Sequence, residues 1–111
     1  MGLTKAALFT EEQQELAAVA KALGHPARMA ILQYLIKTKA CVNGDLVEEI
    51  GLAQATISQH LRELKKAGIV QGTVEGPRVN YCIDGKRWQE LKDLFHDLFE
   101  RFESPDPARC C

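Results

Sequence analysis

Apolar residues recur at helical spacing in the first third of the chain. They lie three or four positions apart, which places their side chains on one face of a helix: Leu16, Val19, Ala20 and Leu23. Thr10, followed by two acidic residues and Gln13, is typical of a capped helix start. The pattern predicts a helix that begins at Thr10 and ends at Gly24, and a second helix that begins at Pro26.

The middle of the chain predicts two further helices joined by a turn at Gly51. The first is short, opens at Asn43 or Gly44, and carries Leu46, Val47 and Ile50. The second is expected from about Ala53 to Ala67. Its apolar stripe falls at positions i, i+4 and i+7, which share one helix face: Ile57, Leu61 and Leu64.

After residue 68, the spacing of the apolar residues changes from that of helices to that of strands. Residues 69–74 and 79–83 are rich in β-branched and aromatic residues, and the turn residues 75–78 separate them. This pattern predicts a β-hairpin. Asp84 is expected to cap a last long helix, which Pro105 and Pro107 stop.

These elements predict a mainly α fold with a small β-hairpin, an α+β winged helix-turn-helix. A length of 111 residues suits one domain rather than two. We expect an N-terminal extension over 1–9, the folded domain over 10–103 and a flexible cysteine-containing tail over 104–111. No cofactor is expected to be required for the fold.

Composition places the chain among ordinary globular proteins, with 46% hydrophobic and 26% charged residues. The apolar runs are too short to span a bilayer, and the first residues lack the features of a signal peptide. No membrane association and a cytoplasmic location are therefore expected. Cysteines there are usually reduced, so the four cysteines are expected as thiols.

Charge is distributed unevenly, although the net charge is only -1. The segment between Leu52 and Trp88 contains six basic and three acidic residues, whereas the segment after Trp88 is mainly acidic. A basic middle between acidic ends suits a protein that meets phosphates with one face. A randomly charged surface is the alternative interpretation.

The helix over 53–67 predicts a surface that reads DNA. In a helix-turn-helix, the second helix lies in the major groove. In the helix over 53–67, the face opposite the apolar stripe carries small and polar residues near its start and basic residues further along. Arg78 at the hairpin tip could reach a neighbouring phosphate or minor groove. The predicted DNA-binding residues are Gln54, Ala55, Thr56, Ser58, Gln59, Arg62, Lys66 and Arg78. For any one of them, a solvated polar face is the alternative. His60, at the edge of the stripe, is expected to pack or hydrogen-bond rather than read bases.

The order of motifs resembles the ArsR/SmtB family of bacterial repressors. The resemblance is carried by residues 22–32, by residues 52–64 and by residues 67–70, which lead into the hairpin, and it covers about residues 10 to 102. It implies a homodimer that binds double-stranded operator DNA and represses transcription. It also implies release from DNA when a metal, a metalloid or an oxidant binds.

Family dimers pair through their first and last helices, and the apolar excess of the last helix agrees with such a role. We expect the dimer interface to contain Leu16, Val19, Trp88, Leu91, Phe95, Leu98, Phe99 and Phe102. The alternative is that these aromatic side chains pack within one subunit.

The inducer is less closely specified by the sequence. Family sensors often carry Cys-x-Cys before the DNA-reading helices, but here Asn43 takes the second position after Cys41. Thiolates are soft ligands, and three of them suit arsenite or antimonite. A tail bearing adjacent thiols could close on another cysteine, so the candidate site for As(III), Sb(III) or another thiophilic metal is Cys41, Cys82, Cys110 and Cys111.

Several alternatives stay open. Zinc or cadmium could be the inducer, and a zinc or nickel site on the last helix could use Asp93, His96, Asp97 and Glu100, although a solvated acidic face explains these better. Disulfide formation could sense oxidants, or the protein senses nothing and Cys82 packs in the fold.

Other functional classes also stay open. The chain could be a protein-interaction module, or a metal carrier that uses the tail. No enzyme is expected, because no nucleophile and base occur at a recognised spacing.

Overall fold

The computed structural model describes residues 8–38, 42–43, 46–75 and 78–103. Its first two helices are α2 (Glu11–Leu23) and α3 (Pro26–Thr38). Thr10 caps α2 as predicted: its side chain accepts from the Gln13 backbone N–H, and the Gln13 side chain accepts from the Thr10 N–H. The predicted starts of both helices are therefore confirmed.

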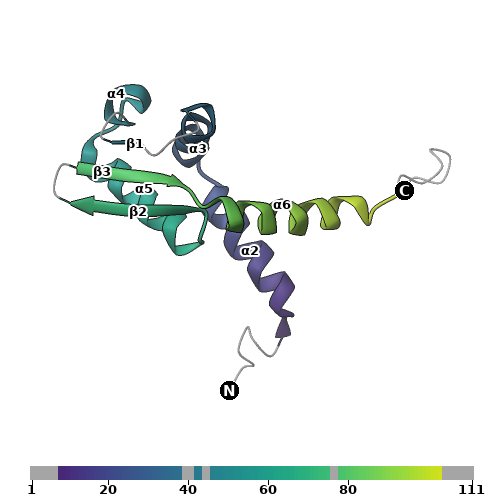
Figure 1. The fold of residues 1–111 in the computed structure, drawn as a ribbon. Coiled ribbons are helices and arrows are strands. Elements are labelled where there is room, and N and C mark those ends of the chain that lie inside the picture. Colours follow the sequence, from purple (N-terminus) through teal and green to yellow (C-terminus); the bar gives the residue numbers. More distant parts are fainter. Residues whose placement is uncertain (1–7, 39–41, 44–45, 76–77, 104–111) are drawn as a thin grey trace, which may run out of the picture.

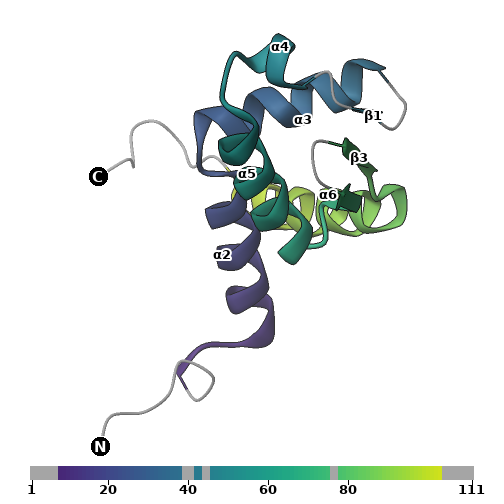
Figure 2. The ribbon, with the colours of Figure 1, turned by 90° about the vertical axis from the view of Figure 1, so that its left-hand side faces the viewer.

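The helix-turn-helix is formed by α4 (Leu46–Ile50) and α5 (Gln54–Lys66). Gly51, in the turn between them, has a φ of 82°, a left-handed conformation that glycine adopts without strain. In Figure 2, α5 lies between α3 and α4 on one side and α2 on the other. The DNA-reading helix of the prediction is thus supported by three other helices.

The start of the short helix was predicted wrongly. Asn43 lies in a two-residue strand, β1 (Val42–Asn43), and α4 begins at Leu46. The reason is a long-range backbone pairing, because β1 adds to the hairpin with Val42 opposite Tyr81 and Asn43 opposite Asn80. The alternative start at Gly44 lies outside the described residues.

The hairpin is present, as predicted, and consists of β2 (Val70–Glu75) and β3 (Arg78–Ile83). With β1 it forms a three-stranded antiparallel sheet in the order β1-β3-β2. Gly72 on β2 has a φ of 141°, and a Cβ there would collide with the carbonyl oxygen of Asn80. The close approach of β2 and β3 therefore requires glycine at this position.

The last helix, α6 (Gly85–Glu100), begins at the predicted cap, where the Asp84 side chain accepts from the Arg87 N–H. It extends away from the sheet (Figure 1). No helix of the described residues is both long and apolar enough to cross a bilayer.

One apolar core joins the helices to the sheet. It is made of buried residues from every helix, with contributions from β2 and β3, and α6 supplies only Leu91. Ile57, Leu61 and Leu64, the predicted stripe of α5, are all exposed by 1% or less. Burial of this stripe orients the opposite face of α5 outward.

Candidate nucleic-acid interface

The exposed face of α5 carries most of the residues predicted to read DNA. The outward-facing set comprises Ala55, Thr56, Gln59, Arg62 and Lys66. Arg62 forms no ion pair within the part of the chain that the structure describes. A guanidinium in this setting can bind a guanine edge or a phosphate oxygen.

Polar contacts along this face are weak. Gln59 Nε2 donates to Glu63 Oε1 at 3.4 Å, and Lys66 Nζ lies 3.5 Å from the same carboxylate. Exposed pairs of this kind contribute little to stability. Gln59 and Lys66 can therefore exchange these contacts for bases or phosphates at small cost.

Ser58 corrects the prediction. It is only 5% exposed, and its Oγ accepts a hydrogen bond of 3.1 Å from Nε2 of the half-buried Gln54. Its position beside the apolar stripe turns Ser58 toward the protein, so the expectation that it faces outward is wrong. The contact instead holds the first turn of α5, where Ala53 at the N-cap provides no side-chain hydrogen bond.

His60 packs rather than reads bases, as expected. It is 9% exposed, its Nδ1 accepts from Arg28 Nε at 3.1 Å, and its ring lies 4.4 Å from that of His25. Burial, with contributions from the charges of His25 and Arg28, lowers the pKa of His60 below its ordinary value. The neutral ring thus links α5 to the start of α3.

The hairpin β2–β3, the wing of this fold, is held to the end of α5 by a residue that the sequence pattern does not reveal. Lys65 Nζ donates to the Gly72 carbonyl oxygen at 2.7 Å, which joins the DNA-reading helix to β2. No local pattern marks such a contact. Arg78 begins β3 opposite Glu75, so its backbone lies at the hairpin tip as expected, and its DNA contact stays a prediction.

The cysteines differ from expectation at the one position that the structure describes. Cys82 on β3 is half-buried and disulfide-bonded, so the expectation of a free thiol there is wrong. Three candidates for the thiophilic site, Cys41, Cys110 and Cys111, lie outside the described residues.

The acidic face of α6 is exposed at Asp93, His96, Asp97 and Glu100. Asp97 accepts from Arg101 at 2.6 Å, and Asp93 accepts from Gln89 at 3.0 Å. Within the described ranges, no three histidine, cysteine or carboxylate side chains come together in a way that could hold a metal ion.

The expected dimer face divides into three groups by exposure. Val19 and Leu91 are 2% and 6% exposed, so they belong to the core of one subunit, and any contact with a partner through the cavity that they line stays a prediction. Trp88, Phe95 and Leu16 are half-buried. Leu98, Phe99 and Phe102 are 41%, 70% and 75% exposed.

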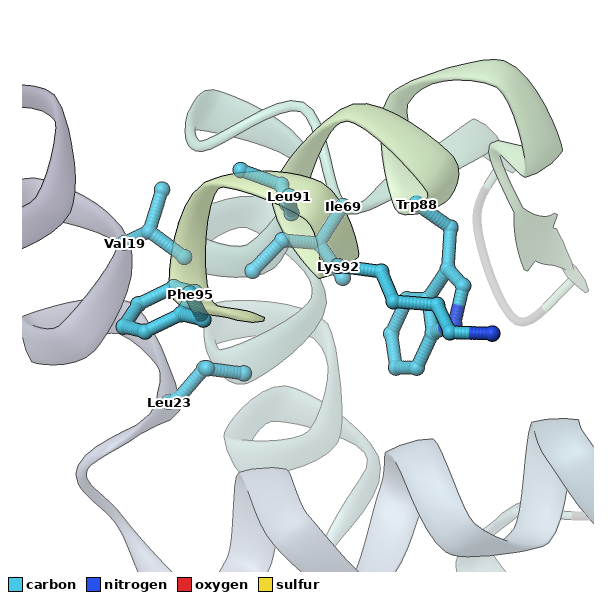
Figure 3. A pocket seen from close by; sticks show the side chains of 7 residues that line it. All are labelled: Val19, Leu23, Ile69, Trp88, Leu91, Lys92 and Phe95. Atoms are coloured by element: carbon cyan, nitrogen blue, oxygen red, sulfur yellow. The ribbon is translucent and has the colours of Figure 1, made fainter. Parts of the chain in front are cut away.

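An apolar cavity of about 200 Å³ opens between α2 and α6. Figure 3 shows the side chains that surround it, among them Leu23 from α2 and Trp88 and Phe95 from α6. Among the described residues, Lys92 is the only charged one in its lining. Together with the exposed aromatic residues beyond it, the cavity leaves α6 with much apolar surface that its own subunit does not cover.

The fold contains two helices joined by a tight turn, and the second helix has a polar outer face. A β-hairpin follows these helices. This arrangement defines a winged helix-turn-helix protein of the DNA-binding class. The family model for bacterial regulatory proteins of the arsR family matches residues 25–71. An uncharacterised HTH-type transcriptional regulator of Methanocaldococcus jannaschii is 36% identical over 88 residues, which cover 79% of this chain and 99% of the relative. The chain therefore belongs to the arsR family.

Two other proteins extend the comparison. The HTH-type transcriptional repressor SmtB of Mycobacterium tuberculosis is 41% identical over 63 residues, covering 57% of this chain and 46% of SmtB. The homodimeric winged helix-turn-helix DNA-binding domain of a possible ArsR-family regulator of Mycobacterium bovis has a TM-score of 0.60 and 26% identity. That match covers 96% of this chain and 99% of the domain.

Proposed function

We propose that the protein is a homodimeric transcriptional repressor that binds double-stranded operator DNA. The outward face of α5 carries the proposal, because Gln59, Arg62 and Lys66 are all exposed on it while the opposite stripe is buried. The repressor role is supported by the relative named as a repressor. The dimer is supported by the homodimeric neighbour and by the exposed apolar residues of α6.

Replacing Arg62 by Ala tests the groove assignment. We expect DNA binding to weaken by roughly 1–3 kcal/mol and discrimination between duplex sequences to relax. Fluorescence anisotropy with a duplex selected by the wild-type protein from a random pool measures both. Arg101→Ala is the matched control, because it removes an exposed arginine from the C-cap of α6 rather than from α5. Unchanged affinity of Arg62→Ala would contradict the assignment.

For the inducer we propose arsenite or antimonite, bound by thiolates. Both prefer soft sulfur ligands, and the tail carries the adjacent pair Cys110 and Cys111. Cys82 of β3 is disulfide-bonded, so sulfur chemistry in this protein is not confined to the tail.

The tail is tested by replacing Cys110 and Cys111 with Ser in reduced protein. We expect arsenite no longer to release this variant from DNA, while its affinity without arsenite stays at the wild-type value. Thr73→Ser, which introduces a serine at an exposed position outside the predicted DNA-binding set, provides the control. Normal release of the double cysteine variant by arsenite would refute the tail as the sensor.

An oxidant is the second candidate inducer, and the disulfide of Cys82 favours it. Two thiols would join as a disulfide while a peroxide takes up two electrons and two protons and leaves as water or alcohol. Peroxide should then release the reduced protein from DNA, and a dithiol reductant should restore binding. Cys82→Ser separates the two candidates if it abolishes release by peroxide but leaves release by arsenite through the tail.

A further inference from the structure

A second, more polar pocket lies where the last turns of α2 meet the second half of α5. Its volume is about 250 Å³, and alanine residues contribute to its lining. Four charged residues surround it: Lys21, Arg28, Lys66 and Glu63. With three cations against one carboxylate, the pocket is suited to an anion.

The three cations differ in how firmly their own subunit holds them. Arg28 is anchored, because Nη1 donates to the carbonyl oxygens of Lys21 and Ala22 at 3.4 and 3.2 Å and Nε donates to His60. Lys66 makes only the 3.5 Å contact with Glu63, and its side chain is 75% exposed. Lys21 is exposed and has no ion pair within the described ranges. Two cations are thus available to an incoming ligand.

The pocket is continuous with the proposed DNA-binding face. Lys66 belongs to both, and α2 lies beside α5 in Figure 2. A helix seated in the major groove has a phosphate strand along each of its sides, and contacts to those phosphates set its register. A cationic pocket beside the helix is therefore placed where a backbone phosphate can be met.

The geometry points to a phosphate-binding site between α2 and α5, in which a DNA backbone phosphate contacts Lys21. This inference rests on the proposed DNA-binding function. Arg28 acts there as a positioning residue that closes the end of α2, and Lys66 supplies a second ammonium. Glu63 opposes the phosphate, so removal of its charge strengthens the site.

Replacing Lys21 by Met tests the site. Each phosphate contact contributes about 0.9 to the slope of log affinity against log salt concentration. Because a homodimer loses the contact twice, Lys21→Met should lower that slope by about 2. The affinity should fall to a similar degree for specific and random-sequence duplexes. Circular dichroism checks that the variant is folded.

Lys37→Met is the matched control. Lys37 also lies in the last turn of a helix, so any effect of the helix macrodipole is shared. It lies at the far end of α3, about 17 Å along the helix from its start beside α2. We expect the wild-type slope and affinity for this variant. An equal loss for both lysines would overturn the site in favour of a general charge effect.

Glu63→Gln tests the same site in the opposite direction. This variant keeps the length of the side chain and removes the charge that opposes the phosphate, so the affinity for DNA should rise several-fold at low salt. A wild-type slope for Lys21→Met, or a loss of affinity for Glu63→Gln, would overturn the site while leaving the repressor proposal intact. Failure of the wild-type protein to bind any duplex would overturn both.

Discussion

Helices α5 and α6 have almost the same amphipathic character in sequence, but the fold treats them differently. Every residue of the apolar stripe of α5 is buried, and only the polar face of the helix is exposed to solvent. On α6 only Leu91 is buried, while Phe99, and Phe102 just beyond the end of the helix, remain mostly exposed. One helix is thus completed within the subunit, whereas the other still lacks a partner for its apolar face.

The difference in burial is the one expected between a helix that binds DNA and a helix that forms a dimer interface. A recognition helix must be held rigidly by its own subunit, because its exposed side chains have to match a groove. A dimerisation helix needs its apolar surface left free until a second subunit covers it. The exposed aromatic side chains of α6 are therefore expected to contribute to association rather than to the stability of one subunit.

The largest expected effect comes from breaking the buried stripe of α5. Leu61→Ala should lower the free energy of unfolding by about 2–5 kcal/mol, because Leu61 is 0% exposed and its loss leaves a cavity. Phe99→Ala removes more side-chain volume from a position that is 70% exposed. At concentrations where the protein is monomeric, it should change stability by about 0.5 kcal/mol or less. Urea denaturation of both variants measures the contrast, and equal losses would contradict it.

A charge at the exposed apolar end of the chain that follows α6 should produce the next largest effect. Phe102→Asp places a carboxylate on a residue that is 75% exposed in one subunit. If a partner covers this face, the dimer dissociation constant should rise at least tenfold, about 1.4 kcal/mol. Sedimentation equilibrium measures it. Gln89→Asp adds the same charge to an exposed polar position of α6, and a similar loss for that control would argue against an apolar interface.

The smallest expected effect concerns pH. Folding lowers the pKa of His60 below 6.5, mainly through burial, so the unfolded chain takes up a proton more readily than the folded one. The stability provided by neutral His60 is therefore present above pH 6.5 and is lost as the pH falls from there toward the lowered pKa.

Thermal unfolding between pH 7.5 and pH values below 6.5 measures this loss, with the wild-type protein as the reference. His60→Asn keeps an acceptor oxygen near the position of Nδ1, which accepts from Arg28 Nε, and cannot take up a proton. Its unfolding should depend less on pH over the same window. A pH dependence as steep as that of the wild-type protein would show that other groups cause it.

Much of the candidate site could be predicted from local sequence. The stripe Ile57, Leu61 and Leu64 defines which face of α5 is buried, and the outward placement of Gln59 and Arg62 follows from the same periodicity. The residues at the edge of the stripe could not be assigned in this way. Ser58 and His60 lie on its two borders, and contacts from Gln54 and Arg28 decide that both are buried.

The thiol chemistry was harder to predict than the DNA-binding face. The sequence predicts reduced cysteines, yet Cys82 is disulfide-bonded. Disulfide formation depends on tertiary contacts rather than on a local repeat, and the pairing of β1 with β3 likewise depends on tertiary contacts. Two residues, Val42 and Asn43, are too few to display a period.

Periodicity, caps and turn residues alone determined the order of the helices and of the hairpin strands β2 and β3, the caps of α2 at Thr10 and of α6 at Asp84, and the outer face of α5. All of these depend on residues within one or two helical turns of each other. Only the tertiary structure decided that Val19 and Leu91 belong to the core, that Lys65 holds the wing and that Lys21 meets Lys66 across a pocket. Those outcomes depend on how complete elements pack together, and the distances between elements are not encoded in any local repeat.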